Sequence, residues 1–228
     1  MEKATQLIEA LFGRPANEFA IPLAAKKWGA VNLNDLANTW ATIERANLRA
    51  TNLLDPMHQE QLLTEVHEQY GIDCSYGGYL EDRSFLLRDT YLPPDGMIHL
   101  GVDYNVPAGT PIALPASGRV VFAIHDKDQE GGWGGRADFF NEEKGIYFIL
   151  GHLDTMTSEY TKGIWFGKGS TAGFLGNSNE NGGWFPHLHL QVVAKDEYER
   201  YDNPMKIDGY GKMTPDLESR YLNPEVLV

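Results

Sequence analysis

The hydrophobic pattern of the chain changes at Gly71. Before this residue, apolar side chains recur at helical spacing. After it, short β-rich runs are separated by stretches rich in glycine, proline and other turn residues. Because no helical stretch separates these runs, they predict an antiparallel, mainly β domain. The predicted strands are residues 110–114, 119–124, 146–150, 171–175 and 188–193.

Two helices are predicted in the N-terminal part of the chain. One spans residues 34–48, and the other begins after Asp55, a typical N-cap residue that precedes a proline, and ends at Gly71. We therefore expect a helical N-terminal segment over residues 1–75 and a β domain over residues 76–228.

The β domain contains two stretches with less regular patterns. Residues 126–144 carry many charges and glycines, so we expect a long loop over one end of the sheet. Residues 196–228 show no clear period, and we expect an irregular wrap that ends in a short run at 221–228.

The composition argues against several classes of partner. The chain has 228 residues, with 19 Lys+Arg against 32 Asp+Glu and a net charge of −13. This acidic balance, without a basic run, argues against a nucleic-acid partner or an anionic membrane surface. The lone cysteine excludes an internal disulfide framework. We expect no transmembrane segment and see no signal peptide, because the N-terminus lacks a basic start and a long apolar run.

His187 and His189 are separated by one residue in a predicted strand. Residues i and i+2 of a strand face the same side, so the two imidazoles point together while Leu188 and Leu190 enter the core. Two such imidazoles can bind one metal ion, or one can bind it while the other transfers protons. The geometry leaves both alternatives open.

His99 and Asp103 could also converge, but only if the chain bends. On a straight strand their side chains would lie roughly 13 Å apart, whereas zinc holds each ligand at about 2 Å. Gly101 could provide the bend. Nitrogen and carboxylate ligands suit zinc, and two histidines with one aspartate leave a fourth position for water, as is typical of catalytic sites.

Three motifs together resemble the lysostaphin/LytM-type zinc metalloendopeptidases. They are His-Leu-Gly-Val-Asp at 99–103, Gly-His-Leu-Asp at 151–154 and His-Leu-His at 187–189. The resemblance covers residues 95–195 and includes a hairpin-like stretch at 106–121. The chain departs from the family pattern in its longer, more acidic 126–144 stretch and in the added residues 179–185.

This resemblance implies a role for each site residue. His99, Asp103 and His189 are expected to bind one Zn²⁺ ion, and His152 and His187 to line its open side as catalytic histidines that are not ligands. The implied fold is an antiparallel β sandwich or partly open barrel of the duplicated hybrid motif type.

The resemblance also implies an activity. We expect a zinc-bound water to hydrolyse peptide bonds in peptidoglycan cross-linking peptides or other flexible peptides. The family suggests the periplasm or cell exterior if the protein is exported. Two alternatives are a non-hydrolytic binding or regulatory member of the same fold and a phosphohistidine carrier on a similar β sandwich. The segment 1–75 could be an inhibitory cover, a targeting domain or a packing partner.

Overall fold

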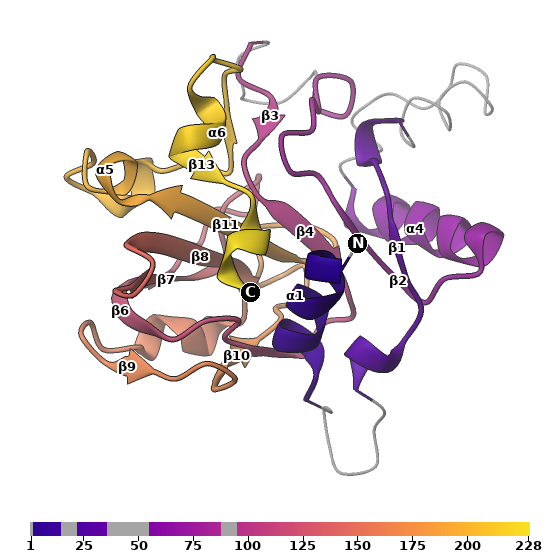
Figure 1. The fold of residues 1–228 in the computed structure, drawn as a ribbon. Helices are drawn as coiled ribbons and strands as arrows, with labels where there is room; N and C mark the ends of the chain where they lie inside the picture. Colours follow the sequence, from indigo (N-terminus) through magenta and orange to yellow (C-terminus); the bar gives the residue numbers. More distant parts are fainter. Residues whose placement is uncertain (1, 15–21, 36–54, 88–94) are drawn as a thin grey trace.

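The computed structural model describes residues 2–14, 22–35, 55–87 and 95–228 (Figure 1). These residues form a mainly β structure with one large mixed sheet, two small sheets and few helices. The fold class predicted from the sequence, a mainly β domain with a helical N-terminal part, is confirmed. No helix in the described ranges has the length and apolar character needed to cross a membrane.

The elements follow the change of pattern in the sequence. The helices and 3₁₀ turns are α1 (Glu2–Phe12), η1 (Leu23–Ala25), α4 (Pro56–Tyr70), η2 (Thr155–Glu159), α5 (Lys195–Tyr198), η3 (Pro204–Lys206), α6 (Leu217–Arg220) and η4 (Pro224–Leu227). The strands are β1 (Trp28–Ala30), β2 (Cys74–Gly77), β3 (Ile98–His99), β4 (Val102–Asn105), β5 (Pro111–Ala113), β6 (Gly118–His125), β7 (Gly135–Asn141), β8 (Ile146–Leu153), β9 (Trp165–Phe166), β10 (Thr171–Phe174), β11 (Leu188–Ala194), β12 (Tyr210–Gly211) and β13 (Tyr221–Leu222).

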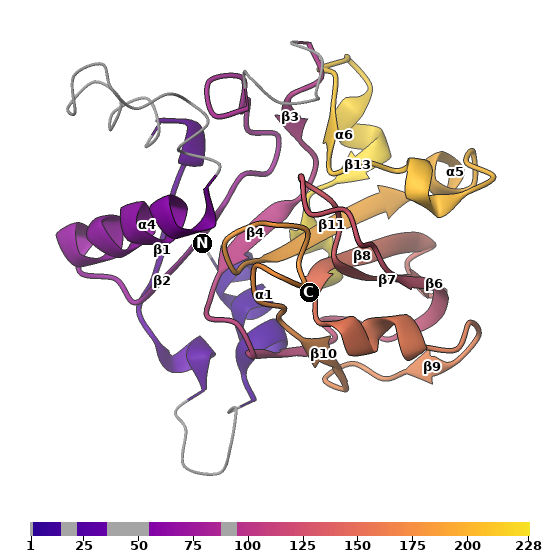
Figure 2. The same ribbon diagram turned by 180° about the vertical axis from the view of Figure 1, so that it is seen from behind.

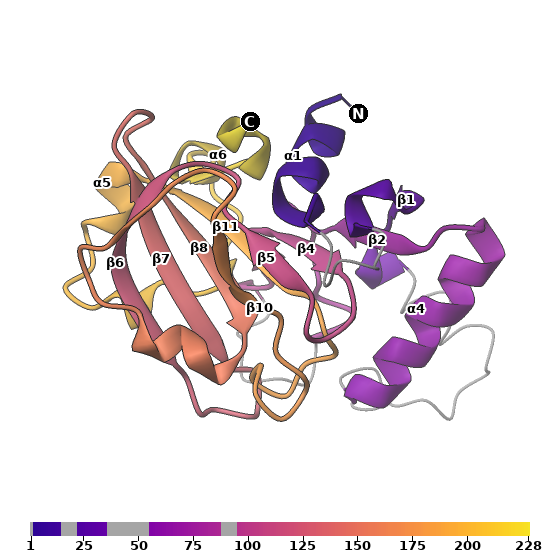
Figure 3. The same cartoon turned by 90° about the horizontal axis from the view of Figure 1, so that it is seen from below.

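The large sheet has the strand order β1-β2-β4-β11-β8-β7-β6-β9, and β13 pairs with β11. The β1–β2 pair is parallel, and the other pairs of this sheet are antiparallel. The small sheet β5–β10 shares a hydrophobic core with the large sheet. Figure 3 shows strands β6, β7, β8 and β11 side by side, and Figures 1 and 2 place α4 and α5 at opposite ends of the molecule.

The helix predicted after Asp55 is confirmed. The Asp55 side chain accepts hydrogen bonds from the backbone N–H groups of Met57 and His58, and Pro56 occupies the first turn. Gly71 ends the helix with a φ of 59°, a left-handed conformation that glycine adopts without strain. The other predicted helix, 34–48, lies outside the described residues except for its first two positions.

The prediction of a long loop at 126–144 is wrong, because strand β7 occupies the second half of this stretch. Ala137 and Phe139 of this strand are fully buried in the main core. The charged residues that alternate with them misled the prediction. Arg136 and Asp138 are also fully buried, and they pair through two hydrogen bonds of 2.8 and 2.9 Å. A charged stretch thus forms a central strand because its charges neutralise one another.

The stretch 196–228, predicted to be an irregular wrap, contains several short helices and strands. The run predicted at its end begins with β13, which pairs with β11 through Tyr221 and Leu222. Elements of two to four residues produce too little periodicity to be recognised in a sequence, so the pattern could indicate only an irregular segment.

The helix α1 packs into the main core of the β structure. Its residues Leu7, Leu11 and Phe12 belong to the same buried cluster as Tyr104 of β4 and Ile112 of β5. In Figure 3, α1 lies beside β4 and β5. The division of the chain into 1–75 and 76–228 stays a prediction, but α1 contributes directly to the core that supports β4.

This packing predicts a large effect of Leu11→Ala on stability. The side chain is fully buried, so its truncation should lower the free energy of unfolding by about 2–5 kcal/mol. The control Gln6→Ala changes an exposed position of the same helix and should stay within about 0.5 kcal/mol. Urea unfolding followed by circular dichroism measures both. Equal, small effects would show that α1 does not stabilise the core.

Candidate metal centre and active site

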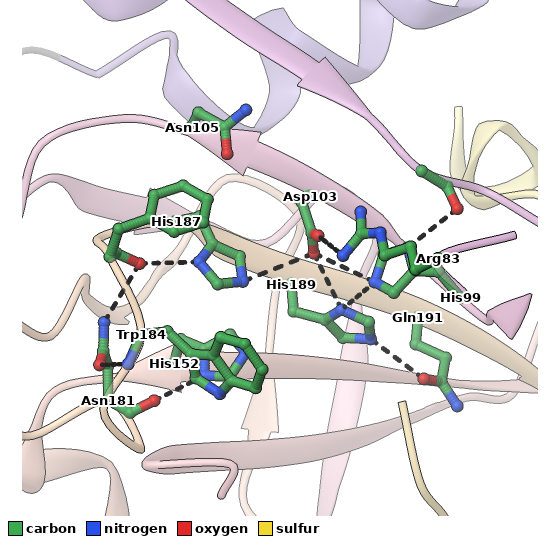
Figure 4. A network of polar contacts seen from close by, with 12 residues as sticks. Arg83, His99, Asp103, Asn105, His152, Asn181, Trp184, His187, His189 and Gln191 are labelled. Carbon is green, nitrogen blue, oxygen red and sulfur yellow. Dashed lines mark hydrogen bonds and ion pairs between the residues drawn. The ribbon is translucent and has the colours of Figure 1, made fainter. Parts of the chain in front are cut away.

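Three neighbouring strands bring most of the candidate residues together. In the large sheet β11 lies between β4 and β8, and His189 of β11 is paired with Asp103 on one side and Gly151 on the other. The strand alternation sends Leu188 and Leu190 into the core. His189 and Asp103 therefore point to the same face, where His187 and His152 also lie (Figure 4).

His99 reaches this face from outside the large sheet. It lies on β3, which pairs with β12, and the chain bends at Leu100 and Gly101 before β4 begins. Through this bend His99 Nε2 lies 3.3 Å from Asp103 Oδ1. Gly101 has a second role, because a Cβ atom there would come within 2.7 Å of the His189 ring.

The ligand atoms of these three residues form a compact, buried triangle. His99 Nε2 lies 3.0 Å from His189 Nδ1, and His189 Nδ1 lies 3.0 Å from Asp103 Oδ1. Among the described residues, these three side chains form the group that could hold a metal ion. Donors bound to a tetrahedral zinc ion at about 2.0–2.1 Å are separated from one another by about 3.3 Å, which is close to these distances.

The outer nitrogens of both histidines are held by acceptors. His99 Nδ1 donates to the carbonyl of Gly78 at 2.9 Å. His189 Nε2 donates to Gln191 Oε1 at 3.0 Å, and the amide of Gln191 is oriented by its own donation to the carbonyl of Asp208. In the neutral rings, His99 Nε2 and His189 Nδ1 therefore carry no proton.

A cation fits this arrangement. Two nitrogen lone pairs and a carboxylate oxygen face one another at 3.0–3.3 Å with no proton left to join them. Such a cluster is repulsive by itself, and a divalent ion at its centre would convert the repulsion into three favourable contacts. The donor set of two imidazoles and one carboxylate is one that zinc binds, and it leaves a fourth position open.

The burial of the site controls the charges of its residues. Burial, followed by the charge of Arg83, lowers the pKa of His99 to about 3, so this ring is neutral at physiological pH. Burial opposes ionisation of Asp103, but the neighbouring His99 and the Arg83 guanidinium outweigh it and hold the pKa of Asp103 well below its usual range. The site thus offers a neutral imidazole beside a carboxylate.

His152 is held in an unusual backbone conformation. Its φ is 64°, in the left-handed region that residues other than glycine rarely adopt. The β7–β8 ladder shifts register opposite this residue, and its N–H and C=O groups bond to Trp133 and Gly176 at 2.9 and 3.0 Å. The ring Nδ1 donates to the carbonyl of Asn181 at 2.7 Å, which leaves Nε2 unprotonated.

His187 lies beside His152 and is oriented in the same way. The ring centroids of the two residues are 4.4 Å apart. His187 Nδ1 donates to the carbonyl of Phe185 at 2.8 Å, and its Nε2 lies 3.7 Å from Asp103 Oδ1. Burial lowers the pKa of His187, and burial with the adjacent histidines lowers the pKa of His152 well below its usual value. Both rings are therefore neutral and can accept a proton at Nε2.

These residues line one cavity of about 200 Å³. Its walls include four aromatic side chains besides the histidines, namely Trp133, Trp184, Phe185 and Tyr210. The lining also includes four residues that precede the first motif at 99–103, namely Leu33, Gln59, Arg83 and Leu86, and the first two belong to the N-terminal segment 1–75. The N-terminal segment thus contributes part of the wall of the site.

The five residues predicted from the sequence lie around this cavity, and the structure adds several that the sequence did not indicate. Gln191 could have been found, because it follows His189 at strand spacing. Arg83 and Asn181 had no such signal. They act on the site through contacts with Asp103 and with the ring of His152, which depend on the tertiary fold.

Residues 97–203 match peptidase family M23. This match confirms the resemblance that the three motifs predicted. The matched segment includes all five predicted site residues, whereas Arg83 and the helices α1 and α4 lie outside it.

Similar curated proteins include the DD-carboxypeptidase/endopeptidase Mpg of Neisseria meningitidis serogroup B, which is 32% identical over 95 residues. The alignment covers 42% of this chain and 20% of that protein, so the chain spans about a fifth of the relative's length. The catalytic domain of lysostaphin from Staphylococcus simulans is 21% identical, with 54% of this chain and 80% of that chain covered and a TM-score of 0.37. A zinc-containing peptidase from Vibrio cholerae is 22% identical over 49% of this chain and 31% of that chain, with a TM-score of 0.36.

The close approach of Gly101 to His189 predicts the effect of Gly101→Ala. The added methyl group would displace the His189 ring, so zinc affinity should fall by about 10- to 100-fold, as when a group that orients a ligand is lost. Gly167→Ala is the control, because a Cβ atom there would meet only Ser170 Oγ, at 3.7 Å. Competition with a chelator measures both affinities, and equal values would contradict this account of Gly101.

Proposed function

We propose that this chain, whose residues 97–203 match peptidase family M23, is a zinc metalloendopeptidase that hydrolyses peptide bonds in peptidoglycan cross-linking peptides. The observation that carries the proposal is the convergence of His99 Nε2, Asp103 Oδ1 and His189 Nδ1 with two further unprotonated imidazoles beside them.

His99, Asp103 and His189 would hold the zinc ion. When bound, zinc supplies Lewis acidity that polarises a carbonyl group and makes a water molecule acidic enough, with a pKa of about 7, to react at neutral pH. Gly78 and Gln191 keep the two histidine ligands in the required tautomers.

His187 is the stronger candidate for the general base. Its Nε2 is free to accept a proton from the attacking water, and Asp103 Oδ1 at 3.7 Å would stabilise the positive charge that the ring then gains. The same ring can pass this proton to the leaving amine, so hydrolysis yields one carboxylate and one amine. His152, which faces His187, would orient the water or the substrate carbonyl.

A flexible peptide suits the shape of the site better than a folded protein. The cavity is small and is bounded by aromatic rings and by the buried N-terminal wall. Peptide bonds of peptidoglycan are the substrate class favoured by the family match and by the similarity to a DD-carboxypeptidase/endopeptidase.

The proposed roles of His152 and His187 predict that their removal lowers activity without lowering the zinc content. His187→Ala and His152→Ala should each lower kcat by about 10²- to 10⁴-fold, because each removes a group that handles protons or orients a reactant. Both variants should retain one zinc ion per chain, since neither residue is a ligand. The release of new amino termini from purified peptidoglycan measures activity, and elemental analysis measures zinc.

His125→Ala is the matched control. This half-buried histidine bonds through Nε2 to the carbonyl of Glu180 and does not line the cavity, so its removal should leave the rate unchanged. Full activity of His187→Ala would exclude the proposed base. Zinc binding by the wild type without any release of amino termini would instead favour the non-hydrolytic alternative.

Metal removal gives an independent test of the ligands. Dialysis against a chelator should abolish release of amino termini, and one equivalent of Zn²⁺ should restore it. Asp103→Ala should bind no stoichiometric zinc and should not recover, because the remaining two imidazoles do not complete the site. Undiminished activity of metal-free protein would refute a zinc mechanism.

A further inference from the structure

Arg83 contacts the carboxylate oxygen of Asp103 that the candidate histidine ligands do not approach. Its Nη1 lies 2.8 Å from Asp103 Oδ2, whereas His99 and His189 approach the other carboxylate oxygen, Oδ1. The two oxygens of Asp103 therefore have different partners. Figure 4 shows the contact between the Arg83 guanidinium and the Asp103 carboxylate beside the candidate ligands.

Arg83 is poorly suited to a purely stabilising role. The residue is 3% exposed, yet its Nε and Nη2 atoms have no hydrogen-bond partner among the described residues. Nη1 also contacts the hydroxyl of Tyr210 at 3.2 Å, and Nε lies 3.6 Å from Glu81, beyond hydrogen-bond distance. Burying a guanidinium with unpaired donors is costly, so the contact with Asp103 has to be explained by what it does at the site.

The position of Arg83 is fixed by the same turn that orients a ligand. A Cβ atom on Gly78 would lie 2.4 Å from Arg83 Nη2 and 2.6 Å from His99 Nδ1. The backbone at Gly78 thus packs against both side chains, and its carbonyl accepts the His99 proton. A side chain larger than hydrogen at position 78 would therefore displace Arg83, His99 or both.

We infer that Arg83 is a positioning residue that keeps Asp103 a monodentate ligand. With Oδ2 engaged by the guanidinium, only Oδ1 is available to the metal. A carboxylate that binds through both oxygens would add a fourth protein donor and fill the position needed by water or substrate. Arg83 thereby preserves the open position. This inference rests on the metal site of the proposed function, and it assigns a role to a residue outside the segment 97–203.

The test uses Co²⁺ in place of zinc in the full-length protein, because cobalt reports its coordination number in its visible spectrum. Four-coordinate Co²⁺ absorbs strongly, and five- or six-coordinate Co²⁺ absorbs weakly. The wild type should show the strong spectrum. Arg83→Met should still bind one Co²⁺ but lose much of this intensity, because Oδ2 is released to the metal.

Glu81→Gln is the matched control. Glu81 is also buried and belongs to the same charged group, but it does not touch Asp103 through a hydrogen bond in the described structure, so the strong spectrum should persist. Arg83→Lys keeps a positive charge but lacks the planar guanidinium group, so its Co²⁺ spectrum should lose part of the absorption intensity. This second variant serves if Arg83→Met does not fold.

The outcomes separate the inference from the proposed function. A wild-type spectrum in Arg83→Met would overturn the inference and leave the metal site intact. Absence of Co²⁺ binding by the wild type would overturn both. Failure of both Arg83 variants to fold, while Glu81→Gln folds, would assign Arg83 to stability and would also overturn the inference.

Discussion

The pairing of β4 with β11 is the constraint on which the rest of the site depends. This register places Asp103 directly opposite His189, and Val102, Tyr104, Leu188 and Leu190 face the core. A shift of β11 by one residue would turn His189 into the core and expose Leu188 and Leu190. The hydrophobic core therefore determines the positions of Asp103 and His189, the candidate metal ligands on these two strands.

Segments outside the M23 match secure both faces of β4. Behind the strand, the Phe12 ring stacks on Trp28 at 5.2 Å and contacts Tyr104 at 5.6 Å. In front of it, Arg83 bonds to Asp103 at 2.8 Å. Within residues 1–75, Phe12 and Trp28 pack behind β4, and Leu33 and Gln59 line the cavity, so this segment is a packing partner of the site. An inhibitory role is not needed to explain its contacts.

Sequence reasoning predicted which candidate residues converge because their signals are local. His187 and His189 share a strand face by simple alternation, and the separation of His99 from Asp103 required the bend that is observed at 100–101. The missed features depend on tertiary contacts. Arg83 lies twenty residues before Asp103 with no periodic relation to it. The prediction of a loop at 126–144 failed because charged residues were expected to be exposed. In the structure Arg136 and Asp138 are buried, since they form an ion pair with each other.

Loop segments beside the strands supply the carbonyl groups that orient most of the histidine rings. The strands supply the positions of His189 and Asp103, but most of their own carbonyl groups are used in the ladder. Three of the four histidines are oriented by carbonyls of loop residues, namely Gly78, Asn181 and Phe185. Two of these carbonyls come from the stretch 179–185, where the sequence comparison of motifs predicts a departure from the LytM-type pattern. This stretch therefore sets the tautomers of His152 and His187, and under the proposed mechanism changes of sequence there would alter proton transfer.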